Sequence, residues 1–159
     1  MADVENIIRQ LQNHDVHLMQ AAPVVLQLMV EHLGKLSSEE RALPELAWMM
    51  AIAEALPIPV LNGWLALYPN VPVMNGYGPS EASDDITEYV LDKPLPESTP
   101  SVPIGRPIPN LTMYVLNDQQ QLQPVGVPGE LCVSGVGVGP GYFNNPEKTD
   151  EVFIQNPFF

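Results

Sequence analysis

The sequence predicts an α/β protein in which parallel β-α-β layers are followed by an antiparallel, β-barrel-like portion. In the first half, short continuous apolar runs alternate with segments of helical periodicity, a pattern typical of parallel strands covered by helices. A loop with four prolines, residues 91–103, ends this pattern, and strand-like segments separated by turn residues follow it. We therefore expect two portions, residues 1–90 and residues 91–159, the second truncated at its C-terminus after "FIQNPFF".

Helices and buried strands are expected to alternate along residues 4–75. Apolar residues recur at helical spacing over residues 4–11, with Asp3 placed to cap that helix. A second helix is expected over residues 23–34, because it begins with proline and ends at glycine, and a third over residues 57–69. The short apolar runs suited to buried strands are residues 16–23, 46–54 and 71–75.

The second half contains two strand-like segments. "LTMYVLNDQQQLQPVG" predicts a hairpin with its turn near "NDQQ". "GELCVSGVGVGPGYF" predicts a strand entering a glycine-rich loop. This loop lacks the Lys-Ser/Thr ending of a phosphate-binding loop, so we expect a barrel loop there. The single cysteine, Cys132, excludes an internal disulfide framework and is expected to be a small buried apolar residue.

Charge and hydropathy exclude several classes of partner. The formal net charge is −13, whereas nucleic acids and anionic membranes require a basic surface. The sequence contains no apolar run of the roughly 18 residues that a membrane helix needs, and it does not open on a signal peptide. We therefore expect a cytoplasmic protein that uses neither nucleic acid nor membrane as a partner.

Ligands of open α/β sheets bind at the carboxyl ends of the strands. The loops that leave the three expected strands begin at Gln20, Glu54 and Asn75. The third loop, within "VPVMNGYGPSEASDD", carries the most polar chemistry, and it raises the question of why a buried strand should end in this way.

Several residue types in this loop suit a nucleotide. Gly76 and Gly78 let the backbone approach a ligand closely, and Tyr77 offers a flat ring for a base. Asn75 has both a donor and an acceptor for an amide-like edge. The polar pair that completes the motif consists of Ser80, which can donate to a phosphate oxygen, and Glu81, which can hold Mg²⁺. The alternative is a plain turn, since Asn, Gly, Pro and Ser are the usual turn residues.

Four ordered motifs resemble the adenylation domains of nonribosomal peptide synthetases. "NGYGPSE" resembles the family motif N-x-Y-G-P-T-E, and "AEALP" resembles an upstream G-E-A-L-P segment. "VPIGRPIPNLTMYVLN" resembles P-I-G-R-P-I-N-x-x-x-Y-V-L. "GELCVSGVGVGPGYFNNPEKTDEVFIQNPF" resembles G-E-L-x-I-x-G-x-G-V-A-R-G-Y and the residues after it. The similarity extends from about residue 14 to the end of the sequence.

The resemblance implies an α/β fold with a distorted barrel and an ATP-dependent, AMP-forming ligase. Such an enzyme condenses an amino acid with ATP, releases pyrophosphate, and loads the aminoacyl adenylate onto a carrier-protein thiol in secondary metabolite biosynthesis. The implied cofactors are ATP/AMP and Mg²⁺. The implied partners are the amino-acid substrate, the remainder of the adenylation domain and a carrier-protein domain bearing phosphopantetheine.

The resemblance also assigns roles to individual residues. It implies that Tyr77 stacks on adenine and Asn75 bonds its amino group, while the backbone of Ala53, Glu54 and Ala55 lines the other adenine face. Ser80 would contact the α-phosphate, and Glu81 would bind Mg²⁺. The side-chain pocket falls on a further set of positions: Gln20, Met50, Ile52, Gly76, Asp84 and Asp85. The two aspartates would favour a polar or cationic substrate side chain, or one of them would face solvent.

The sequence departs from the family pattern at Ser80, where Thr is usual, at Ala53, where Gly is usual, and at Pro140, where Arg or Lys is frequent. It also lacks the family's phosphate loop with its lysine, the "F-D-x-S" motif, the "T-G-D" motif and the C-terminal domain with its lysine. We therefore expect an internal fragment that is inactive in isolation. The alternatives are a non-catalytic structural or interaction module of the same fold, and a fragment of another adenylate-forming ligase such as an acyl-CoA synthetase.

Overall fold

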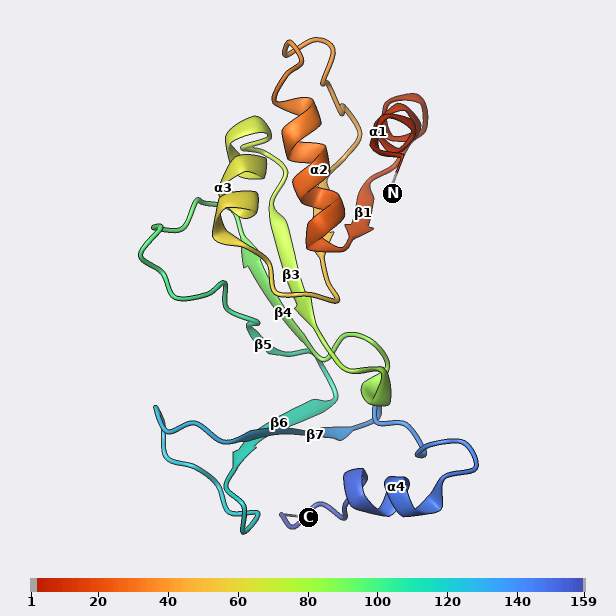
Figure 1. Ribbon diagram of the computed structural model, residues 1–159, viewed down its shortest axis with the longest axis vertical. Helices are drawn as coiled ribbons and strands as arrows, with labels where there is room; N and C mark the ends of the chain where they lie inside the picture. Colours follow the sequence, from red (N-terminus) through yellow and green to blue (C-terminus); the bar gives the residue numbers. More distant parts are fainter. Residues whose placement is uncertain (1–2, 159) are drawn as a thin grey trace. The chain divides into compact units, whose positions relative to one another are not determined.

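The computed structural model describes residues 3–158 and divides into two compact units (Figure 1). Unit 1 comprises Met1–Tyr77 and Glu88–Arg106, and unit 2 comprises Gly78–Thr87 and Pro107–Phe159. The units interleave along the chain, whereas the sequence predicts a single boundary at residue 90.

Unit 1 is an α/β layer structure, as the sequence predicts. Its strands form a five-stranded sheet in the order β1-β2-β3-β4-β5, of which β1, β2 and β3 are parallel. The strands are β1 (Leu18–Ala21), β2 (Trp48–Ala51), β3 (Val73–Tyr77), β4 (Thr87–Leu91) and β5 (Arg106–Pro107). The helices are α1 (Val4–Asn13), α2 (Pro23–Leu33) and α3 (Ile58–Leu67). All three expected helices and all three expected strands of residues 4–75 are therefore confirmed.

Local signals explain where the helices begin. The Asp3 carboxylate accepts a hydrogen bond from the backbone N–H of Asn6 at 3.0 Å, so Asp3 caps α1 as expected. Helix α2 begins at Pro23, whose fixed φ angle suits the first turn and whose missing N–H is not needed there. Between α2 and β2, Ser37 and Glu40 exchange backbone–side-chain hydrogen bonds of 2.9 and 3.3 Å, the reciprocal arrangement of a capping box, but here it closes a turn and no helix follows.

The core of unit 1 lies between the sheet and its helices. Helices α2 and α3 pack side by side (Figure 1), and both bury apolar side chains against β2 and β3. Trp64 of α3 is fully buried, and its indole N–H donates to the carbonyl of Val71 at 3.0 Å. Its ring centroid lies 4.6 Å from that of Tyr68. This indole therefore joins α3 to the segment that leads into β3.

Unit 2 contains an antiparallel sheet, as the sequence predicts for the second half. Strands β6 (Leu111–Leu116) and β7 (Glu130–Gly135) pair over their full length. The unit also contains the short 3₁₀ helix η1 (Ser80–Ala82) and helix α4 (Pro146–Val152). The glycine-rich segment follows β7, as expected, and passes beside η1 (Figure 1).

The predicted hairpin is confirmed at its turn and wrong in its second strand. Gln120 donates its backbone N–H to the carbonyl of Asn117 at 2.9 Å, so the chain does turn at "NDQQ". After the turn only the Leu116–Leu122 bridge forms, and β7 supplies the strand that pairs with β6. Pro124 and Pro128 interrupt the intervening segment, and proline cannot donate to a strand ladder.

Candidate functional site

The predicted pocket residues of unit 1 lie on one face of the parallel sheet. Gln20 pairs in register with Met50, and Met50 with Met74, across β1, β2 and β3. Ile52 and Gly76 follow two residues after Met50 and Met74, and side chains two apart in a strand share a face. The residues between them, Met49, Ala51 and Val73, belong to the core packed against α2 and α3. The predicted set Gln20, Met50, Ile52 and Gly76 therefore faces away from this helix-packed core.

Met74 belongs to this face and was not among the predicted residues. It is partly buried, next to Met50 in register and two residues before Gly76. Alternation from Gly76 would have indicated its face, but its register with Met50 depends on strand pairing, which a single sequence does not reveal.

Asn75 points to the opposite face from Met74 and Gly76, because side chains alternate along β3. It is 4% exposed, and its Nδ2 donates to the carbonyl of Pro103 at 2.8 Å. This hydrogen bond fixes the orientation of the amide. Within residues 3–158, no hydrogen bond is accepted by Asn75 Oδ1, so this oxygen can accept a hydrogen bond from an amino group of a ligand.

Tyr77 ends β3 with an exposed ring, 39% accessible to solvent, whereas Gly76 before it is buried. An exposed aromatic face at the carboxyl end of a parallel strand suits the stacking of a base. The loop Ala53–Ala55, after β2, is also exposed.

Ala53 adopts a left-handed backbone conformation with φ 75°. A side chain costs about 1–2 kcal/mol in this region, and glycine does not incur that cost. We therefore expect Ala53→Gly to stabilise the chain by a net ~0.5–1 kcal/mol, since glycine also loses more chain entropy on folding. The measurement is the midpoint of urea unfolding. Ala55→Gly is the matched control, because Ala55 is exposed in the same loop without a positive φ, and it should destabilise. Equal shifts for both variants would contradict the prediction.

Gly78 begins the part of the motif that belongs to unit 2. A Cβ atom at this position would lie 1.8 Å from the carbonyl oxygen of Asp84 and 2.9 Å from the Cα of Asp85. The close approach that the glycine permits is therefore to its own chain. Ser83 and Asp84 both have positive φ angles, 62° and 75°, which return the backbone toward Gly78.

Ser80 and Glu81 form the first two residues of η1. Ser80 is exposed, and so is Asp84, whereas Asp85 is partly buried and its backbone N–H donates to the carbonyl of Ser83 at 3.1 Å. The hydroxyl of Ser80 and the carboxylate of Asp84 are therefore accessible to a ligand.

The carboxylate of Glu81 is held by Tyr142. The Tyr142 hydroxyl donates a short hydrogen bond to Glu81 Oε1, and this bond is the main reason that the pKa of the Glu81 carboxyl lies below its ordinary value. The same contact raises the pKa of the Tyr142 hydroxyl. Both directions favour an ionised glutamate and a neutral tyrosine. Tyr142 lies at the end of the glycine-rich segment, in "GPGYF", and no local sequence pattern indicates a partner 61 residues away.

Glu81 is suited to share a cation rather than to enclose one. No group of three or more His, Cys, Asp or Glu residues in the described part of the chain could hold a metal ion. Mg²⁺ is commonly bound by one or two carboxylates together with substrate phosphates and waters. An ionised carboxylate with one oxygen engaged by Tyr142 fits that mode.

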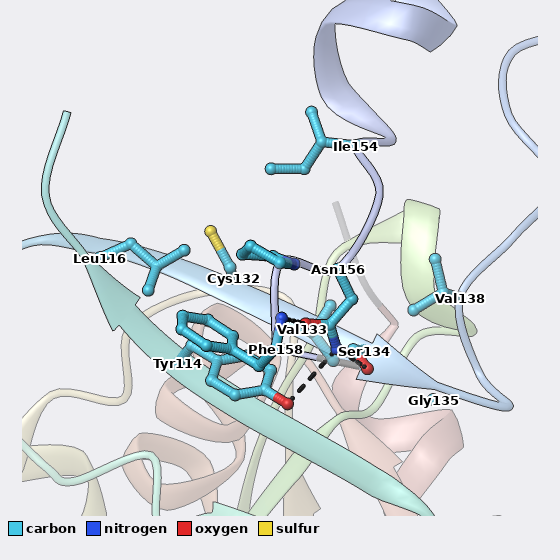
Figure 2. A pocket seen from close by; sticks show the side chains of 11 residues that line it. Tyr114, Leu116, Cys132, Val133, Ser134, Gly135, Val138, Ile154, Asn156 and Phe158 are labelled. Carbon is cyan, nitrogen blue, oxygen red and sulfur yellow. Dashed lines mark hydrogen bonds between the residues drawn. The ribbon is translucent and has the colours of Figure 1, made fainter. Parts of the chain in front are cut away.

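A cavity of about 170 Å³ lies elsewhere in unit 2, against β6 and β7 (Figure 2). Asn156 donates to Ser134 Oγ at 3.0 Å, and the rings of Tyr114 and Phe158 stack 4.9 Å apart beside it. Its lining carries no charged side chain, and none of the predicted site residues contributes to it. Cys132 lines the cavity and is half-buried. Burial, together with the nearby charge of Glu130, raises the pKa of its thiol.

Within residues 3–158, no helix has both the length and the apolar character needed to cross a membrane.

Comparisons with known proteins agree on one family. Residues 1–143 match the model of the AMP-binding enzyme family. The chain is 35% identical to surfactin synthase subunit 3 of Bacillus subtilis over 158 residues, which are 99% of this chain and 12% of the relative. The crystal structure of the nonribosomal peptide synthetase FmoA3 aligns with a TM-score of 0.89 and 25% identity, covering 99% of this chain and 17% of that one. NpsA-ThdA, an artificially fused adenylation–PCP di-domain of Klebsiella oxytoca, aligns with a TM-score of 0.79 and 25% identity over 95% of this chain and 29% of that one.

Proposed function

Since the chain belongs to the AMP-binding enzyme family, we propose that it forms part of an amino-acid-activating enzyme of nonribosomal peptide synthesis. The reaction joins the carboxylate of an amino acid to the α-phosphate of ATP, giving an aminoacyl adenylate and pyrophosphate. The chain spans only 12% of surfactin synthase subunit 3, so the remainder of such an enzyme would supply the other catalytic groups.

The register of β1, β2 and β3 is the observation that carries this proposal. It brings Gln20, Met50 and Met74 into one row, on the same face as Ile52 and Gly76. In this proposal, the face would form a wall of the pocket and contact the amino-acid side chain. Met50 and Ile52 are buried and apolar, and Gln20 is exposed and polar, so the wall would combine an apolar surface with one amide.

The adenine contacts in this proposal come from unit 1. Tyr77 would stack on the base with its exposed ring, and the Ala53–Ala55 backbone would line the other face. Asn75 would accept from the adenine amino group through Oδ1, since its Nδ2 is already engaged by Pro103.

The phosphate contacts come from unit 2. The exposed Ser80 hydroxyl would donate to an α-phosphate oxygen, and Glu81 would hold Mg²⁺ with its ionised carboxylate. Bound Mg²⁺ supplies neutralisation of the negative charge on the phosphates. Asp84 and Asp85, also of unit 2, would favour a polar or cationic substrate side chain through their acidic character.

A carrier-protein domain is the proposed acceptor of the activated amino acid. NpsA-ThdA, which aligns with this chain, is a fusion of an adenylation domain with a PCP domain. By the same proposal, the protein works in the cytoplasm, where ATP is available.

Nucleotide binding tests the proposal. By isothermal titration with ATP and Mg²⁺, we expect Tyr77→Ala to lower the affinity about 5- to 150-fold, because stacking contributes about 1–3 kcal/mol per base. Glu81→Ala should bind equally well with and without Mg²⁺, whereas the unchanged chain should bind more tightly with Mg²⁺.

Tyr89→Ala is the matched control, because Tyr89 of β4 has the same 39% exposure as Tyr77. Its affinity should equal that of the unchanged chain. A folded chain that binds no ATP, or that loses equal affinity in the Tyr77 and Tyr89 variants, would favour the alternative of a non-catalytic module.

A further inference from the structure

Within unit 2, the glycine loop (residues 135–142) makes three hydrogen bonds with the η1 turn, which comprises η1 and its C-cap residue Ser83. The backbone N–H of Gly139 donates to the Glu81 carbonyl at 2.8 Å. The Ser83 hydroxyl donates to the Gly137 carbonyl at 2.7 Å. The third contact is the hydrogen bond from the Tyr142 hydroxyl to Glu81 Oε1. Both the backbone and the side chain of Glu81 are therefore fixed by one distant segment.

Two glycines lie where this loop closely approaches other groups. A Cβ at Gly139 would lie 3.1 Å from the Glu81 carbonyl oxygen, closer than most Cβ contacts. Gly141 has φ 119°, and a Cβ there would lie 2.3 Å from Cγ2 of Thr149. The glycines thus let the loop pass close to η1 and to α4 on its way to Tyr142.

Tyr142 is itself anchored from α4. Its backbone N–H donates to the Thr149 hydroxyl oxygen at 2.9 Å, and that hydroxyl in turn donates to the Asn145 carbonyl at 2.9 Å. The ring packs edge-on against Phe153, with centroids 5.5 Å apart. Backbone and ring are therefore both restrained, so the hydroxyl is presented to Glu81 from a fixed position.

We propose that Tyr142 is a positioning residue that orients the Glu81 carboxylate for a divalent cation. The inference rests on the function proposed above and adds a residue to it. An ionised carboxylate has about four acceptor sites on its two oxygens, so the hydrogen bond from Tyr142 at Oε1 leaves acceptor sites for a cation. The bond also restricts the rotation of a long side chain, which lowers the entropy lost when the cation binds. Groups that orient a metal ligand in this way commonly contribute 10- to 100-fold to metal affinity.

The test uses Mn²⁺ as a paramagnetic probe of the full chain in the presence of ATP. Mn²⁺ affinity is measured by electron paramagnetic resonance for the unchanged chain and for Glu81→Gln, Tyr142→Phe and Tyr114→Phe. We expect Tyr142→Phe to weaken Mn²⁺ binding about 10-fold, and Glu81→Gln to weaken it at least as much. Tyr114→Phe is the matched control, because the Tyr114 hydroxyl in the same unit bonds Asn156 rather than Glu81.

The outcomes separate the two proposals. Weakening by Glu81→Gln but not by Tyr142→Phe would overturn the positioning role and leave the proposed function intact. Absence of ATP-dependent Mn²⁺ binding, or binding unaffected by Glu81→Gln, would overturn the metal role of Glu81 and the positioning role with it. Equal weakening of Mn²⁺ binding by Tyr142→Phe and Tyr114→Phe would indicate a general effect on unit 2, and it would also overturn the positioning role of Tyr142.

Paramagnetic broadening of tyrosine resonances in the unchanged chain tests the same proposal without a variant that must fold. Bound Mn²⁺ broadens proton resonances most strongly close to the ion. If Tyr142 shares the Glu81 carboxylate with the cation, its ring resonances should broaden more than those of Tyr114 when Mn²⁺ is added with ATP. Equal broadening of the two rings would contradict the proposal.

Discussion

The Gly78→Ala variant is expected to lose the native η1 turn, with a destabilisation of about 3 kcal/mol or more. The added Cβ would lie 1.8 Å from the Asp84 carbonyl oxygen and 2.6 Å from its carbon, and both are backbone atoms. No side-chain rotation can relieve such an overlap, so the backbone of residues 78–85 must move. Because Ser80 and Glu81 lie on that segment, the variant should also lose Mg²⁺-dependent ATP binding.

Gly126→Ala separates a clash from backbone strain. Gly126, also in unit 2, has φ 86°, but no atom lies within 4 Å of where its Cβ would be. This variant should be destabilised only by the left-handed conformation, about 1–2 kcal/mol. Urea unfolding measures both stabilities, and amide NMR spectra show which residues move. A Gly78→Ala chain as stable as the Gly126→Ala chain, with unchanged amide shifts at residues 80–85, would contradict the predicted clash.

Trp64→Ala is expected to destabilise unit 1 by about 3–5 kcal/mol, the range typical of removing a buried aromatic side chain. Trp64 is fully buried, contacts Tyr68 and bonds the Val71 carbonyl. Its loss would remove packing between α3 and the sheet and also leave a buried carbonyl without its donor. Since the free energy of unfolding of domains is only about 5–15 kcal/mol, this variant would lose a large share of it.

Trp64→Phe separates the two contributions. It retains an aromatic ring in the core and removes the indole N–H, so it should lose about 1–3 kcal/mol through the unpaired Val71 carbonyl and a smaller ring. Trp48→Phe is the control, because Trp48 is only partly buried. Chemical unfolding followed by circular dichroism compares the variants without relying on tryptophan fluorescence. A loss for Trp64→Ala no greater than that for Trp48→Phe would contradict the prediction.

Local patterns in the sequence were sufficient for most secondary structure. Helical spacing, prolines in first turns and the Asp3 cap act over a few residues, so α1, α2 and α3 could be placed without their partners. The second strand of the hairpin could not be placed in this way, because β6 can pair either with the residues just after the turn or with the distant strand β7. The prolines after the turn and the long-range ladder decided that choice.

The candidate site divides in the same way. The chemistry of "NGYGPSE" and the family resemblance drew attention to Tyr77, Ser80 and Glu81, because residue type and order are properties of the sequence itself. Gly78 was expected to make room for a ligand, and the structure shows that it makes room for Asp84. Asn75 was expected to offer both a donor and an acceptor, and Pro103 already occupies its donor.

The sequence by itself determined the fold class, the alternation of helices and strands, and the residues that carry the polar chemistry. All of these depend on local propensity or on motifs of a few residues. Only the tertiary structure decided which residues share the face proposed as a pocket wall, since strand register aligns Gln20, Met50 and Met74. It also decided that Tyr142 holds Glu81. The physical reason is that both depend on contacts between segments far apart in the chain, whose pairing follows from packing and closure of the whole unit rather than from local preference.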